Sequence, residues 1–122
     1  ICTYEVAKLA REKEFNVQTF DWYDYTGNYN KGFIPHKLHE CPRYKEYYAP
    51  TQGLLQRWLR EEKGIHISVE YEWVEGVDDW TFWEKIKKIN NAKVVNDAIK
   101  SGFNTYELAL EDALKYALEN LV

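Results

Sequence analysis

The sequence has no methionine, only two cysteines and three prolines, and no long apolar run. A membrane span needs about 20 consecutive apolar residues, so we expect neither a transmembrane segment nor a membrane partner. Two cysteines cannot form the disulfide framework of a small secreted scaffold. Because methionine is missing even at position 1, we expect the chain to begin downstream of its translational start, and a short targeting segment could precede it.

Basic residues are fewer than acidic ones. The 16 Lys and Arg residues against 20 Asp and Glu residues give a formal net charge of -4, and no basic run exceeds Lys87-Lys88. The chain therefore lacks the positive field of a general nucleic-acid binder. With 122 residues, 45% hydrophobic and 30% charged, its composition is typical of a folded protein, and we expect a single domain spanning residues 1–122.

Aromatic residues are abundant, with five Trp, ten Tyr and five Phe. Aromatic side chains favour half-buried strands and bring a large apolar area per residue. A sheet with an aromatic face is therefore the first interpretation of this composition. A surface on which a ligand stacks is the second.

Three segments carry the signals of a helix. Apolar residues recur at three- and four-residue steps over 106–121, and Asn104 is placed to cap that helix. The range Thr51–Gly64 predicts a second helix, because threonine caps helix N-termini and glycine adopts the left-handed conformation that ends a helix. A short helix is predicted over 3–13, capped by its threonine.

Two segments alternate apolar and polar residues with the period of a β-strand. Residues 66–73 place their apolar side chains on one side, and residues 80–86 follow after a loop around 75–79. The two strands are predicted to pair as a hairpin that sets Trp73 near Trp80. We expect the side that carries both of these rings to face the core.

The remaining segments have weaker patterns. Strands are predicted over 17–25 and 29–34, a loop over 35–49 and a short helix over 95–99. The resulting order α-β-β-α-β-β-α predicts an α+β domain in which helices pack on an antiparallel sheet.

Three stretches of the chain carry a resemblance to known proteins. They are Ala49-Pro50-Thr51 leading to Leu55 and Trp58-Leu59-Arg60, then Gly64-Ile65-His66-Ile67, and finally Phe103-Asn104-Thr105-Tyr106-Glu107 with Ala109-Leu110-Glu111-Asp112-Ala113-Leu114. In these stretches the chain resembles small uncharacterised proteins encoded by phages and mobile elements of gut bacteria, especially relatives of Bacteroides. The resemblance covers roughly residues 47–122 and implies an intracellular origin. It implies no particular activity, so no functional residue is transferred from it.

One group of residues has the chemistry of a metal site. His36, His39 and Cys41 lie close together in the sequence, and Cys2 could complete a four-ligand zinc site. The spacing matches no common zinc module, and histidines in such loops are mostly polar surface. A disulfide between Cys2 and Cys41 is disfavoured in a cytoplasmic protein. We therefore expect no metal site and no cofactor.

Acidic residues occur in three loose pairs, which are Asp21 with Asp24, Glu70 with Glu72, and Asp78 with Asp79. Carboxylate pairs can perform acid–base chemistry when their environments separate their pKa values. The polar side of a strand and a turn are ordinary places for such residues, and neither predicts that separation. The sequence also lacks a nucleophile elbow, a phosphate-binding glycine loop and a zinc-protease motif. We expect no enzymatic activity.

A candidate binding site lies on the other side of the second hairpin strand. If the ring of Trp80 points inward, Trp83 points outward beside Lys85 and Lys87. An exposed tryptophan flanked by lysines can stack on a nucleobase or anchor a protein partner. The alternative is that a helix covers this face and buries Trp83, and the three predicted helices favour that alternative.

The leading hypothesis is a non-catalytic, cytoplasmic accessory protein of a phage or mobile element. It would bind a macromolecular partner, either another protein or a second copy of the chain. The alternative is a nucleic-acid-binding module that uses Trp83, Lys85 and Lys87. A small enzyme is the third hypothesis, and it requires a pocket that holds a buried carboxylate or histidine.

Overall fold

The computed structural model describes residues 1–32, 46–76, 78–90 and 93–122 of the chain. Within these ranges the elements follow the order α-β-β-β-α-β-β-β-α and form two three-stranded antiparallel sheets. The predicted α+β class is confirmed. The order differs from the prediction by one additional strand before each of the last two helices.

Each helix begins just after a threonine that caps its N-terminus. The helix α1 spans Tyr4–Glu12, α2 spans Gln52–Lys63 and α3 spans Tyr106–Asn120. In each case the threonine hydroxyl accepts a hydrogen bond from the backbone N–H three residues later, which satisfies a donor that has no partner inside the helix. The caps are Thr3, Thr51 and Thr105.

The prediction that Asn104 caps α3 is wrong by one residue. Because the helix starts at Tyr106, the cap position falls on Thr105, whose hydroxyl oxygen lies 3.1 Å from the backbone nitrogen of Leu108. The periodic pattern alone does not distinguish these two neighbouring starts. The other two predicted caps are confirmed, and Gly64 ends α2 in the left-handed conformation with φ at 65°.

A small sheet of three two-residue strands lies beside α1. The strand β1 (Trp22–Tyr23) is flanked by β2 (Tyr29–Asn30) and β3 (Tyr47–Tyr48). The ring of Tyr4 in α1 meets the rings of Tyr23 and Tyr47 edge-on at 5.6 and 5.7 Å. The contacts of these rings join the small sheet to α1.

The predictions for this part of the chain are only partly confirmed. Within the described part of the strands predicted over 17–25 and 29–34, only two residues of each form a strand, and Phe20 is 83% exposed instead of packing in a sheet. The loop predicted over 35–49 ends in the strand β3, which pairs with β1. Residues 33–45 lie outside the described residues.

The large sheet is built from three long strands in sequence order. The strand β4 (Ile65–Val74) pairs with β5 (Asp79–Asn90), which pairs with β6 (Lys93–Phe103), each antiparallel to the next. Trp73 lies directly opposite Trp80. The predicted hairpin and its register are therefore confirmed.

The short helix predicted over 95–99 is wrong, because these residues belong to β6 and pair with β5. A helix of about one turn is unstable by itself. Pairing with the adjacent strand instead satisfies the backbone hydrogen-bonding groups along the segment. The neighbouring β-branched residues Val94 and Val95 also favour an extended backbone.

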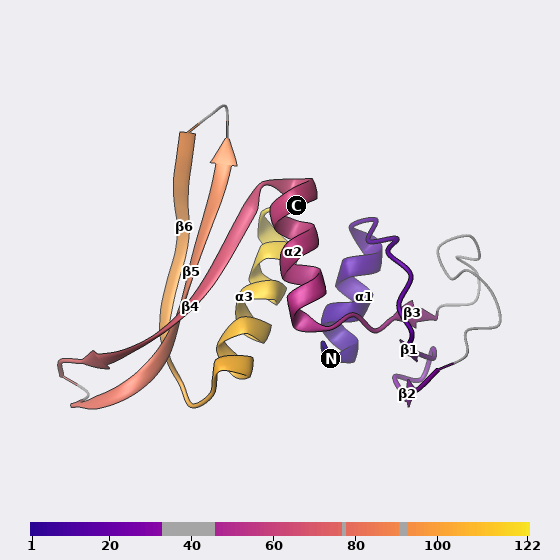
Figure 1. Cartoon of the computed structure of the whole chain (residues 1–122), viewed down its shortest axis with the longest axis horizontal. Coiled ribbons are helices and arrows are strands. Elements are labelled where there is room, and N and C mark those ends of the chain that lie inside the picture. The colour runs from indigo at the N-terminus through magenta and orange to yellow at the C-terminus, as the bar shows by residue number, and fades with distance from the viewer. Residues whose placement is uncertain (33–45, 77, 91–92) are drawn as a thin grey trace.

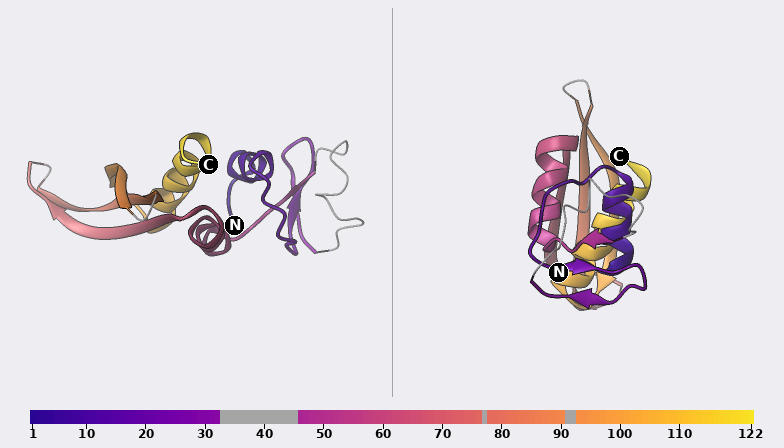
Figure 2. Two further views of the ribbon diagram at one scale, coloured as in Figure 1. Left: turned by 90° about the horizontal axis from the view of Figure 1, so that it is seen from above. Right: turned by 90° about the vertical axis from the view of Figure 1, so that its right-hand side faces the viewer.

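The main core lies between α3 and one face of the large sheet. The buried face of α3 consists of alanine and leucine residues three and four positions apart, as predicted. It packs with Ile65, Ile67 and Ile86 of the sheet and with Leu55 and Leu59 of α2, all at most 2% exposed. Figures 1 and 2 show no described helix on the other face of the sheet.

The strands of the large sheet are longer than the helix that covers them. The 12 residues of β5 correspond to about 40 Å of strand, whereas the 15 residues of α3 form a helix of about 22 Å. The end of the β4–β5 hairpin therefore extends beyond the helices, at the lower left of Figure 1. For this reason the prediction that the rings of Trp73 and Trp80 face the core is wrong: they share the side of Ile67 but are 50% and 53% exposed.

Candidate functional site

Five aromatic side chains form one exposed cluster at the end of the β4–β5 hairpin and the start of α3. The rings of Tyr71 and Phe82 stack with their centroids 4.5 Å apart, and Trp80 lies 5.4 Å from Tyr71. Trp73 meets Trp80 edge-on at 6.2 Å, and Tyr106 meets Phe82 edge-on at 6.5 Å. We call these five residues the aromatic hairpin surface.

The aromatic hairpin surface is accessible although its rings contact one another. Tyr71, Trp73 and Trp80 are 54%, 50% and 53% exposed, and Tyr106 is 41% exposed. Each ring pair contributes a stabilising free energy of about 0.5–1.5 kcal/mol, in addition to that from the apolar area it buries. These contacts hold the cluster in place. A contiguous exposed apolar patch of this kind marks an interaction site, whereas single exposed apolar residues are ordinary.

Acidic side chains accompany these rings. Residues 69–82 contain five acidic residues and no basic residue. The two glutamates of β4 lie on the side of the strand opposite its aromatic rings, and the other three acidic residues belong to the turn and the start of β5. All five are exposed: Glu70, Glu72, Glu75, Asp78 and Asp79. The hairpin end is therefore an apolar surface in a negative field.

The predicted binding residues Trp83, Lys85 and Lys87 lie on the face of the large sheet that no described helix covers, which we call the uncovered face, and all three are partly buried. The helix that we expected over Trp83 is not among the described helices, which pack on the other face. Trp83 lies opposite Glu70, and Lys87 lies opposite His66. The buried indole Nε1 of Trp83 has no hydrogen-bond partner among the described residues. The three residues share one face, but Trp83 presents only part of its ring.

The zinc site and the Cys2–Cys41 disulfide, both disfavoured by the sequence, involve residues that the structure does not describe. His36, His39 and Cys41 lie outside the described residues. Cys2 is fully buried, and burial, with a further contribution from the charge of Glu111, raises the pKa of its thiol to about 12. In the described part of the chain, no group of three or more His, Cys, Asp or Glu residues is arranged to hold a metal ion.

The first predicted carboxylate pair has a structural role. The carboxylate of Asp24 accepts hydrogen bonds from the backbone N–H groups of Thr26 and Asn28 at 2.9 and 3.0 Å. A hydrogen bond from the hydroxyl of Thr26 lowers the pKa of Asp24. Asp21 accepts a hydrogen bond from the hydroxyl of Tyr29. Both carboxylates therefore stabilise the connection between β1 and β2.

Glu84, on the central strand β5, is a titratable group that the sequence analysis missed. It is 1% exposed and lies on the side of the sheet that α3 covers, between Phe82 and Ile86. Burial is the main reason that the pKa of its carboxyl is raised to about 8. The negative charge of Asp112 and a hydrogen bond to Asp112 raise this pKa further, whereas the positive charge of Lys100 lowers it. Its Oε2 has no partner among the described residues. The alternation along the strand indicates this burial, because residues two positions apart lie on the same side, so an inward Phe82 places Glu84 inward as well.

A cleft of about 370 Å³ lies between the start of α1, the end of β6 and α3. Its charged groups form hydrogen bonds or ion pairs, and one of them, Asp112, lies 3.5 Å from Lys100 outside the cleft. Lys115 lies 2.9 Å from Glu5, and Glu111 accepts a hydrogen bond from the backbone N–H of Thr3 at 2.6 Å. Glu84 does not line this cleft. The cleft therefore does not bring the buried carboxyl of Glu84 into contact with a ligand.

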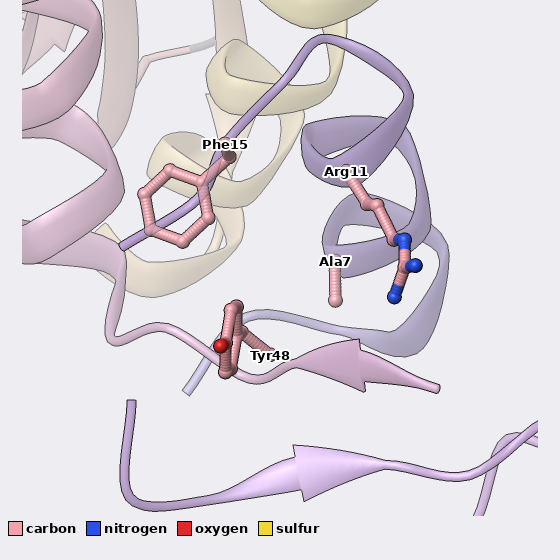
Figure 3. A pocket seen from close by; sticks show the side chains of 4 residues that line it. All are labelled: Ala7, Arg11, Phe15 and Tyr48. Carbon is pink, nitrogen blue, oxygen red and sulfur yellow. The ribbon is translucent and has the colours of Figure 1, made fainter. Parts of the chain in front are cut away.

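A smaller pocket lies between α1 and the small sheet (Figure 3). It is lined by Ala7, Arg11, Phe15 and Tyr48, and its volume of about 10 Å³ is close to the space that one water molecule needs. Arg11 donates a hydrogen bond to the backbone carbonyl of Glu46, next to β3. The pocket is a packing gap beside a structural arginine.

No protein-family model, curated protein or solved structure matches the sequence. Among the described helices, none combines the length and the hydrophobicity that crossing a membrane requires. The aromatic hairpin surface is therefore the feature from which a function is best inferred.

Proposed function

We propose that the protein is a non-catalytic binding module that docks a partner protein on the aromatic hairpin surface. The observation that carries this proposal is a contiguous set of aromatic rings, largely exposed, on a hairpin that extends beyond the helices. Rings that are held in place before binding offer a large apolar area at little cost in conformational entropy. Such residues are frequent hot spots of protein interfaces.

The charge of the hairpin end selects the chemistry of the partner. Residues 69–82 carry five carboxylates and no cationic side chain, so a partner surface with apolar and basic side chains fits them. Cationic side chains also bind favourably over aromatic faces, those of tryptophan above all. A nucleic acid would bring phosphates into the same negative field and is disfavoured on this surface.

The biological setting is part of the same proposal. The resemblance over residues 47–122 supports an accessory role in a phage or mobile element, and hence a cytoplasmic location. The partner would then belong to the host cell or to the element itself. A basic, partly apolar segment is the feature to seek in it.

Selection of displayed peptides tests this proposal. A random peptide library is selected on the wild-type protein, on the Trp73→Ala/Trp80→Ala variant and on the control variant Phe20→Ala/Tyr25→Ala. The control removes two aromatic rings that are 83% and 70% exposed outside the hairpin. We expect peptides rich in apolar and basic residues to bind the wild type and the control, and to bind the hairpin variant about 30-fold or more weakly.

Two outcomes would contradict the proposal. Enrichment of acidic peptides would contradict the charge argument, and unchanged binding to the Trp73→Ala/Trp80→Ala variant would contradict the choice of surface. Circular dichroism of both variants checks that the fold is retained. We expect it to be retained, because the substituted side chains are at least half exposed.

Nucleic-acid binding on the uncovered face of the large sheet is the second candidate. Trp83, Lys85 and Lys87 lie together on that face, which favours it, whereas Glu70 opposite Trp83 weakens the positive field. Titration of the tryptophan fluorescence with oligonucleotides at low and moderate salt separates the two candidates. A salt-dependent response that disappears in Trp83→Ala would favour nucleic-acid binding, and the absence of any response would discard it.

A further inference from the structure

The outer edge of β4 is open along the end of the hairpin. β4 pairs with β5, and no other described strand lies beside it. Near the helices this edge is occupied, because the side-chain amide of Gln56 donates a hydrogen bond to the carbonyl of Ile67 at 2.8 Å. Beyond this contact residues 70–73 are all exposed. An exposed edge strand presents unpaired N–H and C=O groups to which another strand can bond.

The bond from Gln56 also indicates which residues present these groups. It reaches the carbonyl of Ile67 from α2, away from β5, so the backbone groups of Ile67 point outward. The pairing with β5 is regular along the whole strand, and the backbone groups of alternate residues point to the same edge. Val69, Tyr71 and Trp73 therefore present their N–H and C=O groups at the open edge.

The two sides of β4 differ in chemistry along this open edge. Tyr71 and Trp73 lie on the side of the aromatic hairpin surface, and Glu70 and Glu72 lie on the other side. A strand added at this edge would continue both sides, since side chains of adjacent strands lie opposite one another. Its alternate side chains would meet aromatic rings on one side and carboxylates on the other.

We propose that β4 accepts an extended segment of a partner protein as an additional strand, and that this segment alternates apolar with basic residues. This inference rests on the proposed protein-binding function and specifies the form of the partner. The apolar residues pack beside Tyr71 and Trp73, and the basic residues pair with Glu70 and Glu72. Main-chain hydrogen bonds supply affinity in this mode of binding, and the alternate side chains supply specificity.

A second copy of the chain is a poor occupant of this edge. If two β4 strands paired with each other in antiparallel fashion, Glu70 and Glu72 of one copy would lie near the same glutamates of the other. Like charges opposite one another destabilise a pair of strands. Charged residues on an edge strand are also a common protection against pairing between copies. The same carboxylates favour a basic strand.

A synthetic peptide of alternating arginine and valine, about eight residues long, tests the inference by isothermal titration calorimetry. A peptide of alternating glutamate and valine is the charge control. Two N-methylated versions of the first peptide carry methyl groups on its arginine amides or on its valine amides. We expect the arginine–valine peptide to bind and the control to bind more weakly. One methylated version should lose binding and the other should keep it, because a strand uses alternate amides at each edge.

Charge reversal in the protein provides a matched test. The Glu70→Lys/Glu72→Lys variant should bind the arginine–valine peptide about tenfold or more weakly and should gain affinity for the glutamate–valine peptide. The control variant Glu12→Lys/Glu62→Lys makes the same change in net charge at exposed positions of α1 and α2. It should bind both peptides as the wild type does.

The outcomes separate this inference from the proposed function. Equal binding of the two methylated peptides, or an equal loss in both charge variants, would refute strand addition. Loss of binding in Trp73→Ala/Trp80→Ala would then still support docking on the aromatic hairpin surface in another geometry, such as a helix. If the arginine–valine peptide fails to bind while selected peptides bind through the aromatic hairpin surface, the alternating basic strand alone is refuted.

Discussion

Replacement of Glu84 by glutamine should change how the stability of the protein depends on pH. Glu84 is 1% exposed, and burial raises the pKa of its carboxyl from 4.5 to about 8. Between these two values the folded protein holds a proton that the unfolded chain releases. The contribution of this group to stability is therefore complete below pH 4.5 and is lost as the pH rises toward about 8.

The magnitude follows from the two pKa values. One pKa unit corresponds to about 1.4 kcal/mol, so a rise from pH 5 to pH 8 should lower the free energy of unfolding by about 3.5 kcal/mol through this carboxyl. Local relaxation and entry of water reduce this figure, and we expect about 2–3 kcal/mol. Glutamine stays uncharged over the whole range and can still donate a hydrogen bond to Asp112.

Urea unfolding at pH 5, 6.5 and 8 measures this effect in the wild type, in Glu84→Gln and in the control Glu72→Gln, whose side chain is exposed. The other titratable groups are shared, so the difference between wild type and Glu84→Gln isolates one carboxyl. That difference should move in favour of the variant by about 2–3 kcal/mol from pH 5 to pH 8. For Glu72→Gln it should stay within about 0.5 kcal/mol. Parallel pH curves for wild type and Glu84→Gln would refute the reasoning.

Three further predictions concern other buried or constrained positions. Trp83→Phe removes a buried indole N–H that has no partner among the described residues, so thermal unfolding should show equal or higher stability, whereas Trp83→Ala should lower it. The thiol of Cys2, with its pKa raised to about 12, should resist iodoacetamide at pH 8 in the folded protein and should react in urea. Mass spectrometry measures the labelling of Cys2, and equal labelling in both states would contradict its burial. Gly64→Ala places a side chain at φ 65° and should lower the free energy of unfolding, measured in urea, by about 1 kcal/mol. The control Gly53→Ala inside α2, where a Cβ meets no atom within 4 Å, should not lower it.

The elements with strong local signals are predictable because their determinants lie close together in the sequence. A threonine cap needs only the N–H three residues later, and this suffices to place the start of α1 and of α2. The helix predicted over 95–99 fails for the opposite reason. Its residues are extended because β5 is available beside them, and a local pattern contains no information about that partner.

The candidate site is predictable in its contents but not in its exposure. The alternation correctly brings Trp73 opposite Trp80 and sends Trp83 to the other face. It also places Glu84 inward, because Glu84 lies two residues from Phe82 and two from Ile86 on the same side of the strand. That Glu84 is buried while Trp73 is half exposed on the same side depends on where α3 lies.

By itself, the sequence determined the α+β class, most helix ends and the two sides of the hairpin, because each depends on residues a few positions apart. Only the tertiary structure decided how much of the inward side meets a helix. A strand advances about 3.3 Å per residue and a helix about 1.5 Å, so α3 covers only part of β4 and β5. The same side of β4 is therefore core at Ile67 and an exposed aromatic surface at Trp73.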